Sequence, residues 1–213
     1  MSRGLFIAFE GGEHVGKSTH AAWLADKIGA VCTREPGGTE FGKMIRQMIL
    51  DSPTSLEYPT EALLMAADRV QHQAGLVLPT LAAGRHVVTD RSVYSTLAYQ
   101  GFGRGLGIEF VKALNLVSAP VRPDICFLLR ANTRVLSERR ALLGGRDRFE
   151  RAGPAFHERV EEGFDWVAEN AHGVVVIDTS GHETETRHLI ETALETHPEW
   201  IAWKEEQDVS VRG

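Results

Sequence analysis

The sequence predicts an α/β protein whose core is a five-stranded parallel sheet with helices on both faces. Apolar, β-rich runs alternate with helical patterns along the 213 residues, which is typical of such a sheet. Several of the runs are continuously apolar, as expected of parallel strands buried on both faces. The first run leads directly into G-x-x-x-x-G-K-S and then into a helix, which is the context in which this motif binds phosphate.

The apolar runs place the strands, and the segments between them place the helices. Strands are predicted at residues 5–9, 30–33, 86–89, 124–129 and 174–177. Helices are predicted at residues 17–28, 40–50, 59–83, 93–101, 108–117, 133–142, 154–170 and 183–196. The long helix at 59–83 carries an apolar stripe with a 3.6-residue period, from Leu63 to Leu81. The length of the chain favours one domain, here residues 1–197. The polar tail, residues 198–213, is expected to fray after Trp200 and Trp203.

Composition excludes several classes of protein. With 43% hydrophobic and 24% charged residues the chain is expected to be globular, and its net charge of −6 argues against binding to nucleic acid. No apolar run is long enough to span a membrane, and Met1-Ser2-Arg3 leaves no room for a secretory signal, so a cytoplasmic location is expected. Cys32 and Cys126 lie in apolar runs and are expected to be buried, reduced thiols.

The glycine-rich loop is the predicted ATP site. Gly11 and Gly16 let the backbone fold around an anion, and the following helix offers its unpaired N–H groups and positive dipole end. Lys17 supplies charge to the outer phosphates, and the Ser18 hydroxyl is a ligand for Mg²⁺. The whole predicted loop comprises Gly11, Gly12, Glu13, His14, Val15, Gly16, Lys17, Ser18 and Thr19.

Two further strand ends carry reactive groups, where ligands bind in open α/β sheets. Arg34 and Glu35 stand at the entrance of a Pro-Gly-Gly turn. Asp90 and Arg91 pair a carboxylate suited to Mg²⁺ with a guanidinium suited to phosphate. An ordinary ion pair is the other interpretation of Asp90 and Arg91, and their place after a buried strand favours the functional one.

An arginine-rich segment with two adjacent glycines follows at residues 138–159. A solvated charged face is one interpretation. Because arginine forks match phosphate oxygens and the glycines permit movement, a lid at about residues 141–153 that closes over a triphosphate is the other. Arg140, Arg146 and Arg148 are its candidates for catalytic charge.

Taken in order, these motifs resemble bacterial thymidylate kinases, members of the nucleoside monophosphate kinase group of P-loop enzymes. The resemblance extends from about Leu5 to Leu194. Its strings are Phe9-Glu10-Gly11 with Lys17-Ser18, Arg34-Glu35-Pro36-Gly37-Gly38-Thr39, Ala66-Ala67-Asp68-Arg69, Asp90-Arg91-Ser92 with Tyr99-Gln100-Gly101, and Asp147-Arg148-Phe149-Glu150.

The resemblance implies roles for individual residues. Glu13 is implied near the 3′-hydroxyl of the acceptor, and Arg69 and Arg91 on its phosphate, with help from Arg46. The base and deoxyribose are implied to contact Thr96, Tyr99 and Gln100, and the donor adenine to rest on Asp178, Thr179 and Ser180. Arg34 is grouped with the substrate-binding residues, as is Met65, which stands where the family commonly has an aromatic ring. His14 stands where the family commonly has a small residue or, in one branch, an arginine; an exposed histidine without a task and a contact to the transferred phosphoryl are both open.

The implied activity is Mg²⁺-dependent transfer of the γ-phosphoryl group of ATP to dTMP, giving dTDP. The acceptor phosphate is already anionic, so in-line transfer without a general base is expected. A kinase for another small acceptor and an ATP- or GTP-dependent switch are the alternatives; no Asn/Thr-Lys-x-Asp guanine-reading string is present. The family also implies a homodimer.

Overall fold

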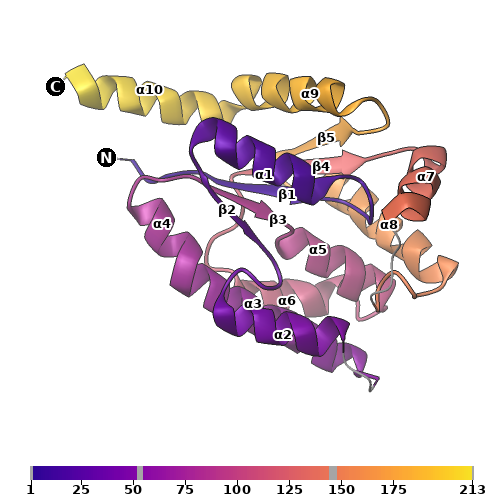
Figure 1. Ribbon diagram of the computed structural model, residues 1–213. Coiled ribbons are helices and arrows are strands. Elements are labelled where there is room, and N and C mark those ends of the chain that lie inside the picture. The colour runs from indigo at the N-terminus through magenta and orange to yellow at the C-terminus, as the bar shows by residue number, and fades with distance from the viewer. Residues whose placement is uncertain (1, 52–54, 144–147, 213) are drawn as a thin grey trace.

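Five parallel strands form one sheet in the computed structural model, which describes residues 2–51, 55–143 and 148–212 (Figure 1). The strands are β1 (Phe6–Glu10), β2 (Val31–Arg34), β3 (Val87–Asp90), β4 (Ile125–Arg130) and β5 (Val174–Asp178), in the order β2-β3-β1-β4-β5. In register, Ala8 of β1 pairs with Thr89 of β3 on one side and with Cys126 of β4 on the other. The predicted fold class is confirmed.

Burial along the strands follows this order. Every residue of the central β1 is buried, whereas the edge strand β2 alternates between half-buried and exposed positions. Cys126 on β4 is buried as expected, but Cys32 on β2 is exposed, so the expectation of two buried thiols is wrong for Cys32. A strand at the edge of a sheet has one neighbouring strand instead of two, so its residues are less covered than those of a central strand.

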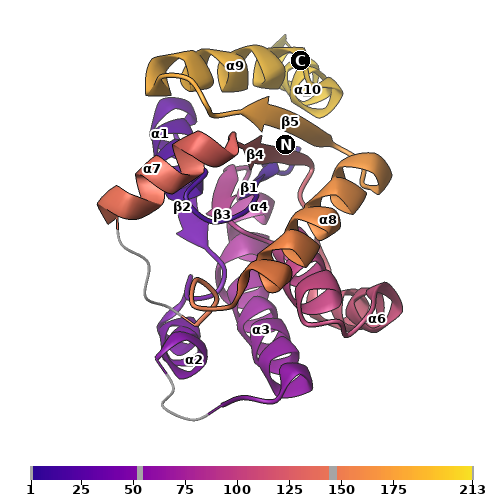
Figure 2. The same cartoon turned by 90° about the vertical axis from the view of Figure 1, so that its right-hand side faces the viewer.

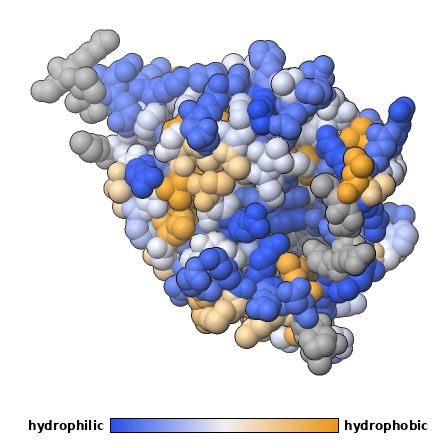
Figure 3. All heavy atoms as spheres, in the orientation of Figure 1, coloured by the Kyte–Doolittle hydropathy of each residue, from blue (hydrophilic) through white to orange (hydrophobic). Residues whose placement is uncertain are grey.

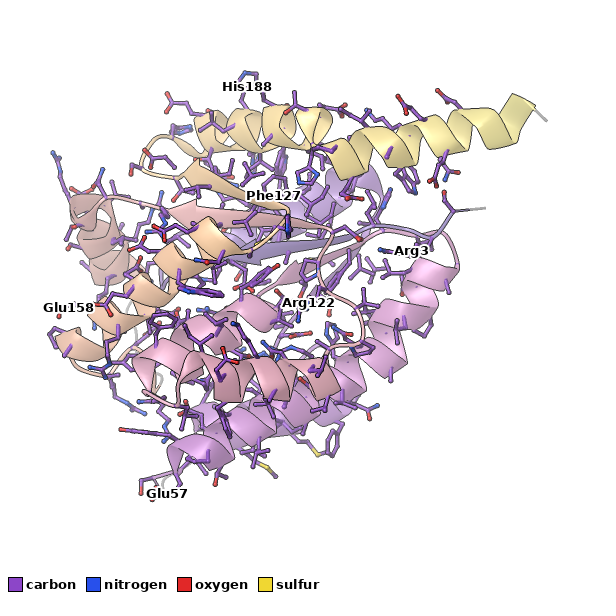
Figure 4. The ribbon with its side chains drawn as sticks, turned by 180° about the vertical axis from the view of Figure 1, so that it is seen from behind. Arg3, Glu57, Arg122, Phe127, Glu158 and His188 are labelled. Carbon is purple, nitrogen blue, oxygen red and sulfur yellow. The ribbon has the colours of Figure 1, made fainter. Side chains whose placement is uncertain are left out.

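Helices cover both faces of the sheet (Figure 2). One face packs against α1 (Lys17–Ile28), α9 (Glu183–Thr196) and α10 (Pro198–Arg212), through side chains such as Phe9, Phe127 and Leu24. Phe127 points from β4 into this interior, while Glu158 and His188 project outward from their helices (Figure 4). The opposite face, which includes Leu128, packs against α8 (Pro154–Asn170) and the elements before it.

The remaining elements connect the strands. They are α2 (Glu40–Leu50), α3 (Tyr58–His72), η1 (Gln73–Val77), α4 (Leu78–Ala82), α5 (Val93–Thr96), η2 (Leu97–Gly103), α6 (Ile108–Ser118) and α7 (Thr133–Leu143). Among the helices of the described residues, none is long and apolar enough to cross a membrane. Hydrophilic side chains predominate on the face shown in Figure 3.

Two predicted helices contain wide π-helical turns. The helix predicted at 59–83 is α3, η1 and α4 in succession, and the one predicted at 93–101 is α5 followed by η2, which extends to Gly103. In η1 the side chain of Gln73 exchanges two hydrogen bonds with the backbone of Val121, at 2.7 and 3.0 Å. Each π turn inserts a residue and so changes which side chains face inward.

The tail begins as a helix that packs on the core through its tryptophans. Residues 198–212 form α10, and the ring of Trp200 is 6% exposed. The imidazole of His86 contacts the rings of Trp200 and Trp203, with centroid separations of 5.3 and 4.3 Å. Gln207 donates a hydrogen bond to Ser2. The tryptophans of this helix therefore complete the core beside α9, although polar residues follow them closely in the sequence.

Candidate active site

The glycine-rich loop joins β1 to α1 with three residues in the left-handed or positive-φ region: Gly11 (132°), His14 (62°) and Gly16 (92°). A side chain at Gly11 would lie 2.3 Å from the carbonyl oxygen of Leu129, so only glycine fits there. The loop places Lys17 at the start of α1, nearly buried, with its ammonium donating to the Gly12 carbonyl. Burial, with Arg91 nearby, lowers the pKa of Lys17 to about 8.

His14 is turned inward in this loop. Its side chain is only 11% exposed, and Nε2 lies 3.8 Å from Oε1 of Glu150. The interpretation of His14 as a solvent-exposed residue is therefore wrong. Nε2 is buried and has no hydrogen-bond partner among the described residues.

A hydroxyl and a carboxylate meet between the loop and β3. Ser18 Oγ donates to Asp90 Oδ2. The other oxygen, Asp90 Oδ1, is buried and receives no hydrogen bond from the described part of the chain. The predicted metal-ligating pair is thus together, with a free oxygen lone pair beside it.

Arg91 and Glu13 face each other across the loop. Arg91 Nη2 lies 2.6 Å from Glu13 Oε1, and the Tyr99 hydroxyl donates to the same oxygen at 2.5 Å. Burial acts to raise the pKa of Glu13, but Arg91 and Lys17 outweigh it and lower that pKa to about 2. Arg91 has a φ of 72°, an uncommon conformation for a non-glycine residue. Glu13 therefore remains ionised and holds the guanidinium in place.

Glu10, at the end of β1, anchors the turn that carries Arg91, and it is not among the site residues predicted from the sequence. It is fully buried and accepts hydrogen bonds from the backbone N–H and hydroxyl of Ser92, at 2.8 and 2.7 Å. It also accepts from the backbone N–H and hydroxyl of Ser95. Burial raises the pKa of Glu10. A glutamate that ends an apolar strand immediately before the loop was the available signal.

Arg69 lies deeper than Arg91. Its guanidinium is 3% exposed and bonds Glu35 (2.7 Å), Asn115 (3.0 Å), the carbonyl of Ser92 (3.1 Å) and Thr96 Oγ1 (2.7 Å). Burial acts to raise the pKa of Glu35, but the charge of Arg69 and the contact with His72 outweigh it and lower the pKa. The pair is therefore charged and mutually compensated, and one of the five N–H groups of Arg69 has no partner among the described residues.

A cavity of about 560 Å³ brings most of the predicted residues together. The predicted residues that line it are Glu13, His14, Gly16, Lys17, Ser18, Thr19, Arg34, Arg46, Met65, Arg69, Asp90, Arg91, Thr96, Tyr99 and Gln100. Gly11, Gly12 and Val15 shape the loop without being part of this lining.

The arginines of the predicted lid are distributed differently from expectation. Arg140 donates to the carbonyl of Glu150 at 3.0 Å, and Arg148 to the carbonyl of Leu56 at 2.8 Å; the cavity lining includes neither. Arg146 lies outside the described residues. Arg139, not among the predicted site residues, lines the cavity.

Arg139 joins the loop to the end of β5. It donates to the carbonyl of His14 at 3.2 Å and to the carbonyl of Thr179 at 2.6 Å. Adjacent helix positions differ by about 100° in direction, so Arg139 and Arg140 on α7 face different ways. The helical rotation therefore indicates, from the sequence alone, that these two arginines do not share one role.

These features define a class of protein. A phosphate loop follows the central strand of the parallel sheet, an Asp-Arg pair stands at the end of the neighbouring strand, and basic residues surround their common cavity. This combination is typical of P-loop phosphotransferases of the nucleoside monophosphate kinase type.

Comparison with known proteins narrows the class. The family model described as thymidylate kinase matches residues 9–190. A thymidylate kinase of Burkholderia vietnamiensis is 40% identical over 205 residues, covering 91% of this chain and 98% of that relative. One of Cupriavidus taiwanensis is 40% identical over 203 residues, covering 91% and 99%. The crystal structure of a thymidylate kinase from Ehrlichia chaffeensis superposes with a TM-score of 0.73 at 28% identity, covering 90% of this chain and 99% of that one. The chain belongs to the thymidylate kinase family.

Proposed function

We infer that this protein transfers the γ-phosphoryl group of ATP to dTMP, giving dTDP. The observation that carries the inference is that two sets of groups open on one cavity. Lys17 and the Ser18–Asp90 pair occupy one part of it, and Arg91 with Glu13 lies beside them. A donor triphosphate and an acceptor phosphate, both anionic, are thereby accommodated by groups that supply positive charge.

The donor side is assigned to the phosphate loop. Its backbone N–H groups and Lys17 receive the phosphates of ATP. Arg139 and Thr179 lie where ATP would extend from its phosphates at the loop to its nucleoside. Asp178 and Ser180 are the neighbouring candidates for contact with adenine.

The residues present fit a magnesium ion. Mg²⁺ prefers oxygen ligands and is usually held by one or two protein groups, phosphates and water. The unpartnered Asp90 Oδ1 and the Ser18 hydroxyl provide such oxygens. No group of three or more His, Cys, Asp or Glu side chains suited to a metal occurs among the described residues. The ion would neutralise charge on the phosphates.

The assignment of the acceptor side follows from the location and exposure of each arginine. Arg91, at the loop, is assigned to the phosphate of dTMP, with Arg46 and Arg34 on the same cavity wall. Both arginines have a carboxylate partner, but the side chain of Arg69 is only 3% exposed against 18% for Arg91. We therefore assign the remaining N–H of Arg69 to one hydrogen bond with the nucleotide and not to a phosphate grip. Thr96, Gln100 and Met65 are assigned to the base, the Tyr99 ring to the 2′ side of the sugar and Glu13 to its 3′-hydroxyl.

The transfer itself requires little proton chemistry. The acceptor phosphate is an anion and attacks the γ-phosphorus in line, so the protein orients the two nucleotides, excludes water and supplies positive charge. Arg139 is the described arginine of α7 that touches the loop, which makes it a further candidate for that charge beside Arg140, Arg146 and Arg148. Replacing Arg139, Arg140 and Arg148 by glutamine in turn and separating kcat from KM ranks them, since a contact made only in the transition state lowers kcat.

A coupled assay of ADP release tests the function. With dTMP, dUMP, dCMP, dGMP and AMP as acceptors, we expect the highest kcat/KM for dTMP. Rejection of dCMP should exceed rejection of dUMP, because a lost hydrogen bond discriminates more strongly than a missing methyl group. A preference for another acceptor would indicate a different kinase, and ATP hydrolysis indifferent to all five would favour the switch alternative.

We also propose that two copies of the chain associate through α2, α3 and α6. Large apolar side chains are exposed on these three neighbouring helices, at Phe41, Met44, Met48, Leu63, Val70, Phe110, Leu116 and Val117. Exposed large apolar side chains on helices that contact one another are typical of interfaces.

A further inference from the structure

Glu61, on the first turn of α3, is a fully buried carboxylate to which the reaction chemistry above gives no role. Its Oε1 accepts from Gln100 Nε2 at 2.9 Å. Arg104 donates to both oxygens, through Nε and Nη2, at 3.0 Å each. Arg148 Nε lies 3.4 Å from Oε2. Glu61 thus connects Gln100 on η2, Arg104 directly after η2, and Arg148 in the segment that leads to α8.

The contact with Gln100 fixes the direction of an amide. An ionised carboxylate can only accept hydrogen bonds, so Gln100 must turn its NH₂ group toward Glu61. The bidentate contact of Arg104, at 9% exposure, keeps the carboxylate itself in place. The amide oxygen of Gln100 receives no hydrogen bond from the described residues, and Gln100 lines the active-site cavity. The amide oxygen of Gln100 is therefore a hydrogen-bond acceptor available to a ligand in this cavity.

Pyrimidines differ at the atom that such an acceptor would meet. N3 of thymine or uracil carries a hydrogen, whereas N3 of cytosine is itself an acceptor. We propose that Glu61 is a positioning residue for base selection, which acts through Gln100 by keeping the amide oxygen toward the nucleotide and so favours a base with an N3–H group. This inference rests on the proposed function, because it concerns the same acceptor site.

The test compares two variants that break the same ion pair. E61Q replaces the carboxylate by an amide that donates as well as accepts, so the Gln100 amide is free to reverse. R104Q removes the same pair but leaves the carboxylate, and with it the direction of Gln100. For each protein, kcat/KM is measured with dTMP and with dCMP, and thermal stability is measured alongside.

We expect both variants to lose stability, and only E61Q to lose selectivity. The ratio of kcat/KM for dTMP over dCMP should fall at least about tenfold in E61Q, in line with the value of one hydrogen bond, and stay within about twofold in R104Q. Should E61Q not fold, the double variant E61Q/R104Q, which replaces both members of the pair by neutral groups, takes its place with the same expected ratio. Should R104Q not fold, R104K serves as the control.

The outcomes separate this proposal from the function. An unchanged ratio in E61Q, or an equal fall in the control, overturns the role of Glu61 while leaving the kinase activity intact. A wild-type protein that uses dTMP and dCMP equally also overturns it. A wild-type protein inactive with both nucleotides overturns the proposed function, and the positioning role with it.

Discussion

Lys17 combines a high degree of burial with a formal charge, at 6% exposure and with a pKa near 8. Its ammonium donates to the Gly12 carbonyl, and no carboxylate of the described residues forms a salt bridge with it, so its charge is available to phosphate. Replacing Lys17 by alanine should lower kcat at least about a hundredfold, as expected for a lost electrostatic contact to the transition state. The coupled ADP assay measures this, with circular dichroism to verify folding.

A matched control lies on the same helix. Lys27 is half exposed and pairs with Glu191 at 2.6 Å. Lys27→Ala should retain activity close to that of the wild type. A folded Lys17→Ala protein with near-normal turnover would contradict the assignment of the loop.

Asp68 predicts a pH dependence of stability. Burial raises its pKa to about 6, and Oδ2 has no hydrogen-bond partner in the described part of the chain. Between about pH 4, where an unfolded aspartate ionises, and pH 6, the folded state binds more protons, so stability falls as pH rises through this range. The ionised form then costs roughly 3 kcal/mol above pH 6, from a shift of about two pKa units.

Asp68→Asn should therefore raise the free energy of unfolding at pH 7.5 and make little difference at pH 4. The asparagine oxygen can still accept from Gly37 N–H, which the carboxylate does at 2.9 Å. Urea unfolding at the two pH values measures the effect, with the exposed Asp26→Asn on α1 as control. A stabilisation of equal size at both pH values would show that the charge of Asp68 is not the cause.

At this scale, the sequence identifies residues whose role depends on their neighbours along the chain. Lys17, Ser18 and Asp90 belong to motifs, and a strand end places each of them. Glu61 and Arg139 were not found in this way, because their roles arise from partners distant in sequence. Glu10 has a local signal in its place at the end of an apolar strand, but its partners are distant as well. Glu10 binds Ser92 and Ser95, and Glu61 binds Gln100 and Arg104. A buried carboxylate has no local pattern that identifies its partner.

Among the elements, α10 is the one whose contribution to stability is most directly testable. Trp200 packs against the cluster of α1, α9 and the sheet. Trp200→Ala should reduce the free energy of unfolding by about 3–5 kcal/mol, as typical for a large aromatic side chain removed from a core. Ile201→Ala, at the neighbouring exposed position, is the control and should change it far less. If both variants unfold at the same urea concentration as the wild type, α10 is not part of the core.

Element positions were largely predictable, and their internal geometry was not. Apolar runs located every strand of the sheet to within about a residue, and α1, α2, α8 and α9 have the predicted bounds. The π turns of η1 and η2 could not be predicted, since the inserted residue is accommodated by contacts such as that of Gln73 with Val121. The packing of the two tryptophans of the tail could not be predicted, because their partner, His86, lies far away in the sequence.

At the scale of the whole molecule, the proposed association of two chains can be measured. The mass of one chain is 23.5 kDa, so light scattering should give twice that value for the wild type. Replacing Leu63 and Val70 on α3 by glutamate should give a single chain, because charges would be buried in the interface. Leu142→Glu, at an exposed position on α7, should leave the mass unchanged. A wild type already at 23.5 kDa would contradict the proposal.

The position of β1 has a consequence for how the chain is made. This first strand is the centre of the sheet, yet its partners are residues 87–90 and 125–130. On the ribosome, β1 emerges with both edges unpaired and must wait for more than a hundred further residues before the second edge is covered. Unpaired strand edges promote aggregation, and long-range pairing is slow. The strand that delivers the phosphate loop is thus made first but is enclosed on both sides only after β4 has emerged, so an unpaired edge persists in nascent chains shorter than about 130 residues.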